Sequence, residues 1–431
     1  MKIFFTILIF FLHINFSHAE DSLIFFVESA YKNNPKLNSE RKNLKAIKEN
    51  VNISRSEFLP SITLTKDVDS TESSNKTNQS GVSLPDSSIN KESQSISVDQ
   101  KIFQGFQGYN SVKKSKLEFD KANFELKQVE QEIILGSASV YFDLIYKSEN
   151  KKFNLANVDL FERQVESDSA RLQKGEITLT DIAQSESSLA GARAKLIAAQ
   201  TELLTTKTNF KRITRLDPPK KIKENYELEV NLPKNLKDAL TISEKNNPKL
   251  AIAKVNLKIS EKNVSIERAQ LSPSASINYS KSETSDLSAT IDNADQESLK
   301  ATVTWPIIKG GKNFSSLKKS KFNKEKTDLI FEDINNEVKT ETTNAWSIYQ
   351  SAESVLKSTE AQVKAAEIAN EGITSEYDSG NTRTTLEVIQ SRSLLLDARI
   401  ANAKAERDYV ISKFKLLSAI GDLTLENVKN S

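Results

Sequence analysis

The sequence predicts a mixed α/β chain that consists mainly of long α-helices and contains an internal tandem duplication. The duplication is indicated by the hexapeptide KNNPKL, which occurs at residues 32–37 and again at 245–250. The helices are indicated by the placement of proline, which interrupts them: no proline lies in 86–217 or in 307–431. Each half of the chain therefore has room for helices well beyond the average length in globular proteins.

The N-terminal segment 1–19 is typical of a signal peptide. Lys2 provides a positive start, residues 3–11 form an apolar core, and a small-residue cleavage site precedes Glu20. The apolar run is short for a membrane span, and a retained anchor helix is the alternative interpretation. We therefore expect an exported mature chain that begins near Glu20.

The residue content excludes several classes of function. The chain has no cysteine, and its two histidines, His13 and His18, lie in the expected signal peptide. A mature chain without either residue type excludes Ser-His-Asp and Cys-His catalysis, disulfides and the usual zinc, haem and iron–sulfur ligands. The 60 basic and 58 acidic residues nearly balance, which does not fit a nucleic-acid surface. We expect no enzyme activity, no cofactor, no metal site and no nucleic-acid partner.

Both long helical regions are expected to fold back once, at Gly175 and at Gly380. Each glycine can end a helix, and threonines shortly after it can cap a return helix. The return helices carry heptad seams that are mostly apolar, as coiled-coil packing requires. The seam positions are Ile182, Ser185, Leu189, Ala192, Leu196, Ala199, Leu203, Thr206, Phe210 and Ile213, and then Leu386, Ile389, Ser393, Leu396, Ile400, Ala403, Arg407, Val410, Phe414 and Leu417. An ordinary antiparallel hairpin without a lumen fits these seams equally well.

Further landmarks recur at nearly constant spacing and fix the domain organisation. The matched pairs are Pro60 with Pro273, Gly105 with Gly310, Phe142 with Trp346, Gly175 with Gly380, and Asp181 with Glu387. We expect a first structural repeat over 20–215, a linker over 216–233, a second repeat over 234–423 and a C-terminal tail over 424–431.

Each repeat also contains two short segments with strand periodicity. Apolar and polar residues alternate in Ser61–Thr65, Ser95–Asp99, Ser276–Ser280 and Lys300–Trp305. The sequence predicts β-hairpins at about 58–104 and about 273–308, with long polar loops over Thr71–Glu92 and Ser282–Glu297.

These strands could contact lipid or could form two soluble hairpins. If their apolar faces contact lipid, four strands cannot close a barrel, because an open sheet edge leaves backbone groups unsatisfied in hydrocarbon. Several copies of the chain would then complete the barrel, and Trp305 would suit an interfacial anchor.

The order of these elements, and their duplication, resembles the TolC family of bacterial outer membrane efflux proteins from about Asp21 to Leu423. The stretches that carry the resemblance are FLPSITL, DQKIFQGF, SVYFDLIY, RLQKGEITLTDIAQSES, TWPIIKGG and SEYDSGNTRTTLEVIQSRSLLLDAR.

The resemblance implies a homotrimer that builds a twelve-stranded β-barrel in outer membrane lipid, continued by a twelve-helix α-barrel in the periplasm. It implies the outer membrane channel component of a tripartite efflux pump or type I secretion system, with a periplasmic adaptor and an inner-membrane pump as partners. A periplasmic coiled-coil adaptor or scaffold is the alternative, although an adaptor is expected to have one hairpin rather than a duplicated chain.

The resemblance also implies a gate near the helical turns, where the adaptor would contact Gly175 and Gly380. Thr180 and Asp181 match the acceptor positions of the family's gate, and Tyr377 matches its tyrosine. We expect the Tyr377 hydroxyl to bond Asp181 across helices.

Three further gate positions lie on the second return helix or just before it. Arg383 matches the gate arginine, although the turn before it is one residue longer here, and its guanidinium is also expected to bond Asp181. Glu387 takes the place of an aspartate, and Gln390 stands where relatives have a second one. The resemblance therefore implies a single acidic ring, formed by Glu387, and weak block of the channel by multivalent cations.

Overall fold

The structure is a computed structural model that describes residues 22–219, 231–288, 290–379 and 383–429. The expected signal peptide, most of the expected linker and Gly380 lie outside the described residues. The helices are α1 (Leu23–Asn33), α2 (Pro35–Ser56), α3 (Gln107–Gln173), α4 (Leu179–Thr214), α5 (Leu236–Asn246), α6 (Pro248–Ala269), α7 (Lys312–Asp378), α8 (Thr385–Ala419) and α9 (Leu425–Lys429). The strands are β1 (Ser61–Ser73), β2 (Ser87–Gln104), β3 (Ser274–Ser288) and β4 (Ile291–Thr304).

The chain folds as two compact units, and each unit takes segments from both halves of the sequence. The first comprises 1–40, 126–248 and 336–431, and the second comprises 41–125 and 249–335. None of the helices in the described ranges has a stretch long and apolar enough to pass through a membrane.

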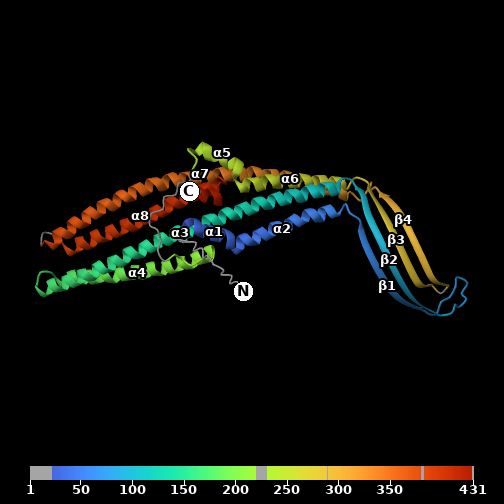
Figure 1. Ribbon diagram of the computed structural model, residues 1–431, viewed down its shortest axis with the longest axis horizontal. Coiled ribbons are helices and arrows are strands. Elements are labelled where there is room, and N and C mark those ends of the chain that lie inside the picture. The colour runs from blue at the N-terminus through green and yellow to red at the C-terminus, as the bar shows by residue number, and fades with distance from the viewer. Residues whose placement is uncertain (1–21, 220–230, 289, 380–382, 430–431) are drawn as a thin grey trace, which may run out of the picture. The chain divides into compact units, whose positions relative to one another are not determined.

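In the first unit, α3 with α4 and α7 with α8 form two long helical hairpins (Figure 1). The ends of the hairpins pack on an aromatic core in which Phe26, Tyr141, Phe142, Phe210 and Phe414 are all buried. Every position of the first predicted seam is buried or half-buried, and in the second seam only the first residue, Leu386, is exposed. The heptad pattern therefore identified the buried faces of both return helices.

Each copy of the repeated hexapeptide separates two helices and contacts the end of a return helix. Asn34 and Asn247 each stand between two helices, directly before a proline that suits a first helical position. The Asn34 amide donates to the carbonyl of Ile213, and the Asn247 amide donates to the carbonyl of Ala419, at 3.2 and 2.8 Å. Each copy of the motif thus anchors the end of the return helix in its own repeat.

In the second unit, the four strands form one antiparallel sheet in the order β1-β2-β3-β4 (Figure 1). One row across it consists of Ile62, Val98, Tyr279 and Leu299. Two corners between a strand and a long helix use the repeated glycines: Gly105 and Gly310 have φ values of +60° and +56°, which a side chain would strain.

The predicted polar loops are shorter in the structure than the sequence indicated. Pairing continues to Ser73 opposite Ser87 in the first hairpin, and to Ser288 opposite Ile291 in the second. Most of Ser282–Glu297 is therefore strand, whereas in Thr71–Glu92 the residues 71–73 and 87–92 are strand and 74–86 remain a loop. The sequence hid this because these strand ends are polar on both faces, so the apolar alternation that signals a strand is missing.

Candidate gate at the helical turns

The turn between α3 and α4 has the geometry that its glycine predicts. Gly175 has a φ of +77°, and its amide donates to the carbonyl of Leu172 at 2.9 Å. The amide of Glu176 donates to the carbonyl of Arg171 at 3.0 Å. These bonds satisfy the last carbonyls of α3, and the chain can then reverse into α4.

The Asp181 carboxylate caps the start of its own helix, α4, and the bonds described for it are with Thr178. Thr178 is the N-cap, and its amide and hydroxyl donate to Oδ2 of Asp181 at 2.9 and 2.7 Å. This capping box lowers the pKa of Asp181, mainly through the Thr178 hydroxyl and then its amide. Thr180 is exposed beside it.

The start of α8 repeats this arrangement, which explains why Asp181 and Glu387 correspond in the two repeats. The amide and hydroxyl of Thr384 donate to Oε2 of Glu387 at 2.8 and 3.0 Å. Arg383 pairs with Oε2 of Glu376 at 2.6 Å and with Oε1 of Glu387 at 3.0 Å. The Thr384 amide and the Arg383 guanidinium both lower the pKa of Glu387.

Tyr377 is buried at the end of α7 and connects the two hairpins. Its hydroxyl donates to Oδ1 of Asp168 on α3 at 2.9 Å and lies 3.1 Å from the hydroxyl of Thr385 on α8. The guanidinium carbon of Arg171 lies 4.6 Å from the centre of the tyrosine ring. Burial is the main cause that raises the pKa of Tyr377, so the hydroxyl stays protonated and keeps its hydrogen.

Asp168 is fully buried, and three side chains donate to its carboxyl group. Besides Tyr377, the amide of Gln164 donates to Oδ1 at 2.9 Å, and the hydroxyl of Ser185 donates to Oδ2 at 2.5 Å. Arg392 on α8 donates to the side-chain oxygen Oε1 of Gln164 at 3.0 Å, and burial lowers the pKa of Arg392. We call Gln164, Asp168, Ser185, Tyr377, Thr385 and Arg392 the Asp168 cluster.

The expected bonds from Tyr377 and Arg383 to Asp181 differ from the bonds that these two residues make within the single chain. Within the described residues, Tyr377 contacts Asp168 instead of Asp181, and Arg383 stays within its own hairpin. The reason is local: Asp181 serves as the third residue of a capping box, whereas Asp168 faces Tyr377 from the buried side of α3. Gln390 is exposed on α8, one turn from Glu387, and both line a shallow groove beside α7.

The sequence contained one signal for the role of Asp168, which is that polar residues occupy seam positions of α3. In the last part of α3, one seam of buried residues has the alternating three- and four-residue spacing, and most of the residues in this seam are polar. They are Asn154, Asn157, Phe161, Gln164 and Asp168. Polar residues at seam positions cost stability unless they are satisfied, so they mark sites where a specific contact is made.

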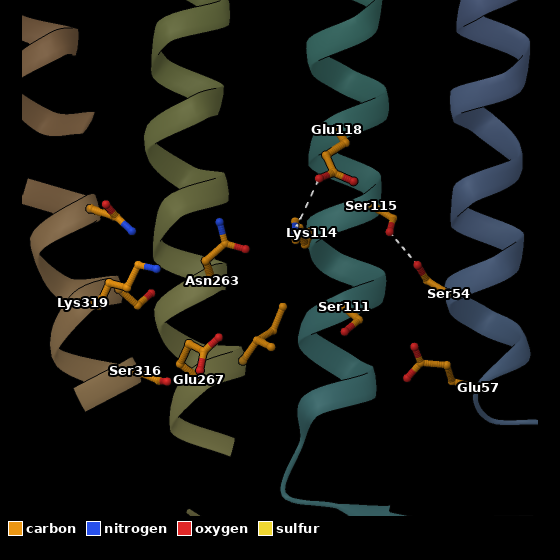
Figure 2. Close-up of a pocket in the computed structure, with 13 residues that line it drawn as sticks. Ser54, Glu57, Ser111, Lys114, Ser115, Glu118, Asn263, Glu267, Ser316 and Lys319 are labelled. Carbon is orange, nitrogen blue, oxygen red and sulfur yellow. Dashed lines mark hydrogen bonds and ion pairs between the residues drawn. The ribbon is translucent and has the colours of Figure 1, made fainter. Parts of the chain in front are cut away.

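A second polar site lies in the other unit, on α2, α3, α6 and α7 (Figure 2). The spacing Ser111-x-x-Lys114-Ser115 recurs as Ser316-x-x-Lys319-Ser320, and all six residues line one groove.

The Ser-x-x-Lys spacing occurs in some acyl-transfer enzymes, but the contacts here do not activate a serine. Lys114 pairs with Glu118 at 3.7 Å, and the Ser115 hydroxyl lies 2.6 Å from that of Ser54, as Figure 2 shows. The groove is lined mainly by hydroxyl, amide and charged side chains. Among the described residues, no group of His, Cys, Asp and Glu side chains is placed to hold a metal ion.

Comparisons with known proteins match both halves of the chain. The model of the family described as "Outer membrane efflux protein" matches residues 26–214 and 240–422. The outer membrane efflux protein BepC of Brucella suis is 26% identical over 400 residues, covering 93% of this chain and 85% of BepC. The outer membrane protein TolC of Vibrio cholerae is 23% identical over 420 residues, covering 95% and 92%.

Solved structures share the fold across nearly the whole chain. The outer membrane channel CmeC of Campylobacter jejuni superposes with a TM-score of 0.79 at 17% identity, covering 95% of this chain and 89% of CmeC. A membrane protein from Pseudomonas aeruginosa gives a TM-score of 0.81 at 14% identity, covering 94% and 91%. Because the family model spans both repeats, this chain belongs to the outer membrane efflux protein family.

Proposed function

We propose that this chain is one subunit of a passive, trimeric exit duct in the outer membrane, serving a tripartite efflux pump or a type I secretion system. The observation that carries the proposal is the duplicated family match together with a four-stranded sheet that has two open edges. The chain would catalyse no reaction, and the energy for transport would come from an inner-membrane pump.

The open edges of the sheet support assembly from identical copies. β1 and β4 each pair on one side only. Because the strands alternate in direction, β4 of one copy can pair antiparallel with β1 of the next and close a barrel. Closure satisfies the edge groups that hydrocarbon would leave unpaired, and three copies would supply twelve strands.

Coiled-coil seams that are at least partly exposed in the single chain support the same assembly in the helical unit. On the face of α4 opposite its buried seam, small and apolar residues repeat with alternating four- and three-residue steps and are all exposed. They are Ala183, Ser187, Ala190, Ala194, Ile197, Thr201, Leu204 and Thr208.

α7 carries a second seam with the same spacing. Its residues are exposed or half-buried, and one of them, Thr359, also bonds Asn402 of α8 at 3.0 Å. The seam residues are Ile348, Ala352, Val355, Thr359, Gln362, Ala366, Ala369 and Ile373. Two such seams fit a helix of a neighbouring copy, since knobs-into-holes packing requires this periodicity on both partners.

The proposed passage has a hydrophilic wall. On one face of the sheet, two successive rows consist only of hydroxyl and amide side chains. They are Thr63, Ser97, Ser280 and Ser298, and then Thr65, Ser95, Ser282 and Gln296. This hydroxyl face is the less exposed face of β2 and β3, as expected for the inside of a curved sheet.

The gate would lie at the helical turns, and the Asp168 cluster would hold the two hairpins of one subunit together. Thr180, Asp181, Arg383, Glu387 and Gln390 would face the passage or the neighbouring copy near the turns. A periplasmic adaptor would contact the turns at Gly175 and Gly380 and release the hairpins on docking.

Planar bilayers test the duct directly. We expect full-length protein, extracted from outer membranes in detergent, to give discrete ion-conducting steps, with the low open probability of a closed gate. Protein that fractionates as a soluble periplasmic monomer and never conducts would instead support an adaptor or scaffold and contradict the proposal.

A further inference from the structure

The sheet is longer than a membrane requires. Strands that cross a bilayer need about 9–11 residues, whereas β2 has 18 residues and β3 has 15. The outer surface of the strands is also not uniform: it is apolar in the half next to the helices and polar in the other half.

The face opposite the hydroxyl face is apolar only near the helices; we call it the outer face. Its three rows there are Phe103, Ala275 and Val303, then Gln100, Ile277 and Ala301, and then Ile62, Val98, Tyr279 and Leu299, so that Gln100 is the one amide among them. These side chains project into the surroundings: Leu299 and Val303 are each 75% exposed.

Aromatic side chains mark the limit of this apolar band on the side of the helices. Phe58, Phe103, Phe106 and Trp305 are all exposed near the junction of strands and helices. The indole of Trp305 donates to the carbonyl of Leu271 at 3.2 Å, which fixes its position at the end of β4. Exposed aromatic residues in a girdle are typical of a membrane–water interface.

Charged side chains mark the limit of the apolar band on the side away from the helices. The next row of the outer face pairs Leu64 and Ile96 with Lys281 and Glu297, and the row after it contains Lys66, Gln94, Glu283 and Asp295. Ion pairs join these positions: Lys66 with Glu92 and Lys281 with Glu283, each at 3.3 Å. Charges on a lipid-facing surface destabilise most at the middle of the bilayer and little at its edge.

Beyond the charged rows, the sheet is mainly polar on both faces. On the outer face the following row contains Glu92, Ser285 and Asn293, with Val68 as its apolar member. From Ile96 to Phe103, β2 spans eight residues, close to the length that a membrane strand needs. In the remaining part of β2, 87–95, the outer face has only polar residues, and Ile89 lies on the opposite, hydroxyl face.

We infer that bilayer hydrocarbon contacts only the half of the sheet next to the helices, between the aromatic girdle and the charged rows. The other half, formed by 66–73, 87–95, 281–288 and 291–297, stands in water outside the cell as a collar. The inference rests on the proposed function for which end of the sheet faces outward.

Single cysteines test the boundary, because the chain has no cysteine of its own. Ser285→Cys and Asn293→Cys lie opposite each other in the collar, and Ile277→Cys and Ala301→Cys lie opposite each other in the apolar band, on the same two strands. Each variant of the full chain is expressed in intact cells and treated with a membrane-impermeant maleimide, and denatured samples give the total thiol.

We expect the two collar cysteines to react at least about tenfold faster than the two band cysteines. Equal protection of all four, or rapid reaction of Ile277→Cys, would overturn the inference. Conductance of the same purified variants is measured in parallel: a conducting channel with a protected Ser285→Cys contradicts the collar alone, whereas a membrane-free, non-conducting protein contradicts the proposed function.

Discussion

The hydroxyl of Tyr377 lies 2.9 Å from Oδ1 of Asp168, and this bond joins two residues that are 209 positions apart in the chain. Tyr377 is the penultimate residue of α7, the first helix of the second hairpin, and Asp168 lies near the end of α3, the first helix of the other hairpin. Both side chains are buried, so the bond is protected from competing water. A pair of this kind can hold two long hairpins in register close to their turns.

Removing the Tyr377 hydroxyl should loosen the hairpins without unfolding the chain. Tyr377→Phe takes one donor from a buried carboxyl group, and such bonds to charged groups contribute about 1.5–3 kcal/mol. We expect a higher open probability in planar bilayers, and Asp168→Asn should act in the same direction.

Asp159→Asn is the matched control for this prediction, because Asp159 lies on the same helix as Asp168 but is exposed and pairs with Arg163 one turn away. Its conductance should equal that of the unaltered protein. If Tyr377→Phe and Asp159→Asn behave alike, the Asp168 cluster does not hold the gate.

Acid should fray the starts of both return helices. The capping boxes lower the pKa values of Asp181 and Glu387 from ordinary values of 3.8 and 4.5. A lowered pKa in the folded state gives stability that is present above the ordinary pKa and is lost as the pH falls through the lowered one.

We therefore expect hydrogen exchange at the first turns of α4 and α8, corrected for intrinsic rates, to stay constant from about pH 7 to about pH 5 and to rise below about pH 4. In Asp181→Asn, the α4 turn should exchange quickly at every pH. A pH-independent rate in the unaltered chain would show that the capping carboxylates do not stabilise these turns.

Glu387 should set the sensitivity of the channel to multivalent cations. It is the acidic residue expected at this level, with Gln390 one turn further along α8. We expect weak block of conductance by trivalent cations, weaker still in Glu387→Gln, and stronger block in Gln390→Asp, which would add three carboxylates to a trimeric ring. Equal block of the unaltered channel and of Glu387→Gln would refute the assignment.

The exposed seam of α4 should be needed for assembly but not for folding of one chain. Ile197→Glu and Leu204→Glu place charges at seam positions that are 63% and 66% exposed in the single chain. We expect normal helical content by circular dichroism and a large loss of oligomer on gel filtration. Lys195→Glu, on the same helix but outside the seam, is the control and should assemble normally.

Much of this architecture could be predicted from local signals in the sequence. The repeat, the glycine turn at Gly175 and the heptad seams each depend on residues close together in the chain, so the pattern contains the information. The strand segments around Ile62 and Leu299 were also identifiable, because one of their faces is apolar.

The remainder depends on contacts between distant residues or lacks a distinctive pattern. A buried Asp168 looks like any surface carboxylate until the fold places Tyr377 against it. The outer halves of the strands, such as Ser87–Ser95, resemble loops because both of their faces are mainly polar. The preference of Asp181 for its own capping box over Tyr377 depends on a competition that composition does not reveal.

The number of subunits in the membrane-extracted complex tests the central claim most directly. Native mass spectrometry of protein released from outer membranes in mild detergent should give the mass of three mature chains, and the same preparation should conduct in bilayers. A conducting preparation that contains a single chain would contradict the account, since the described part of one chain provides four strands, too few to close a barrel.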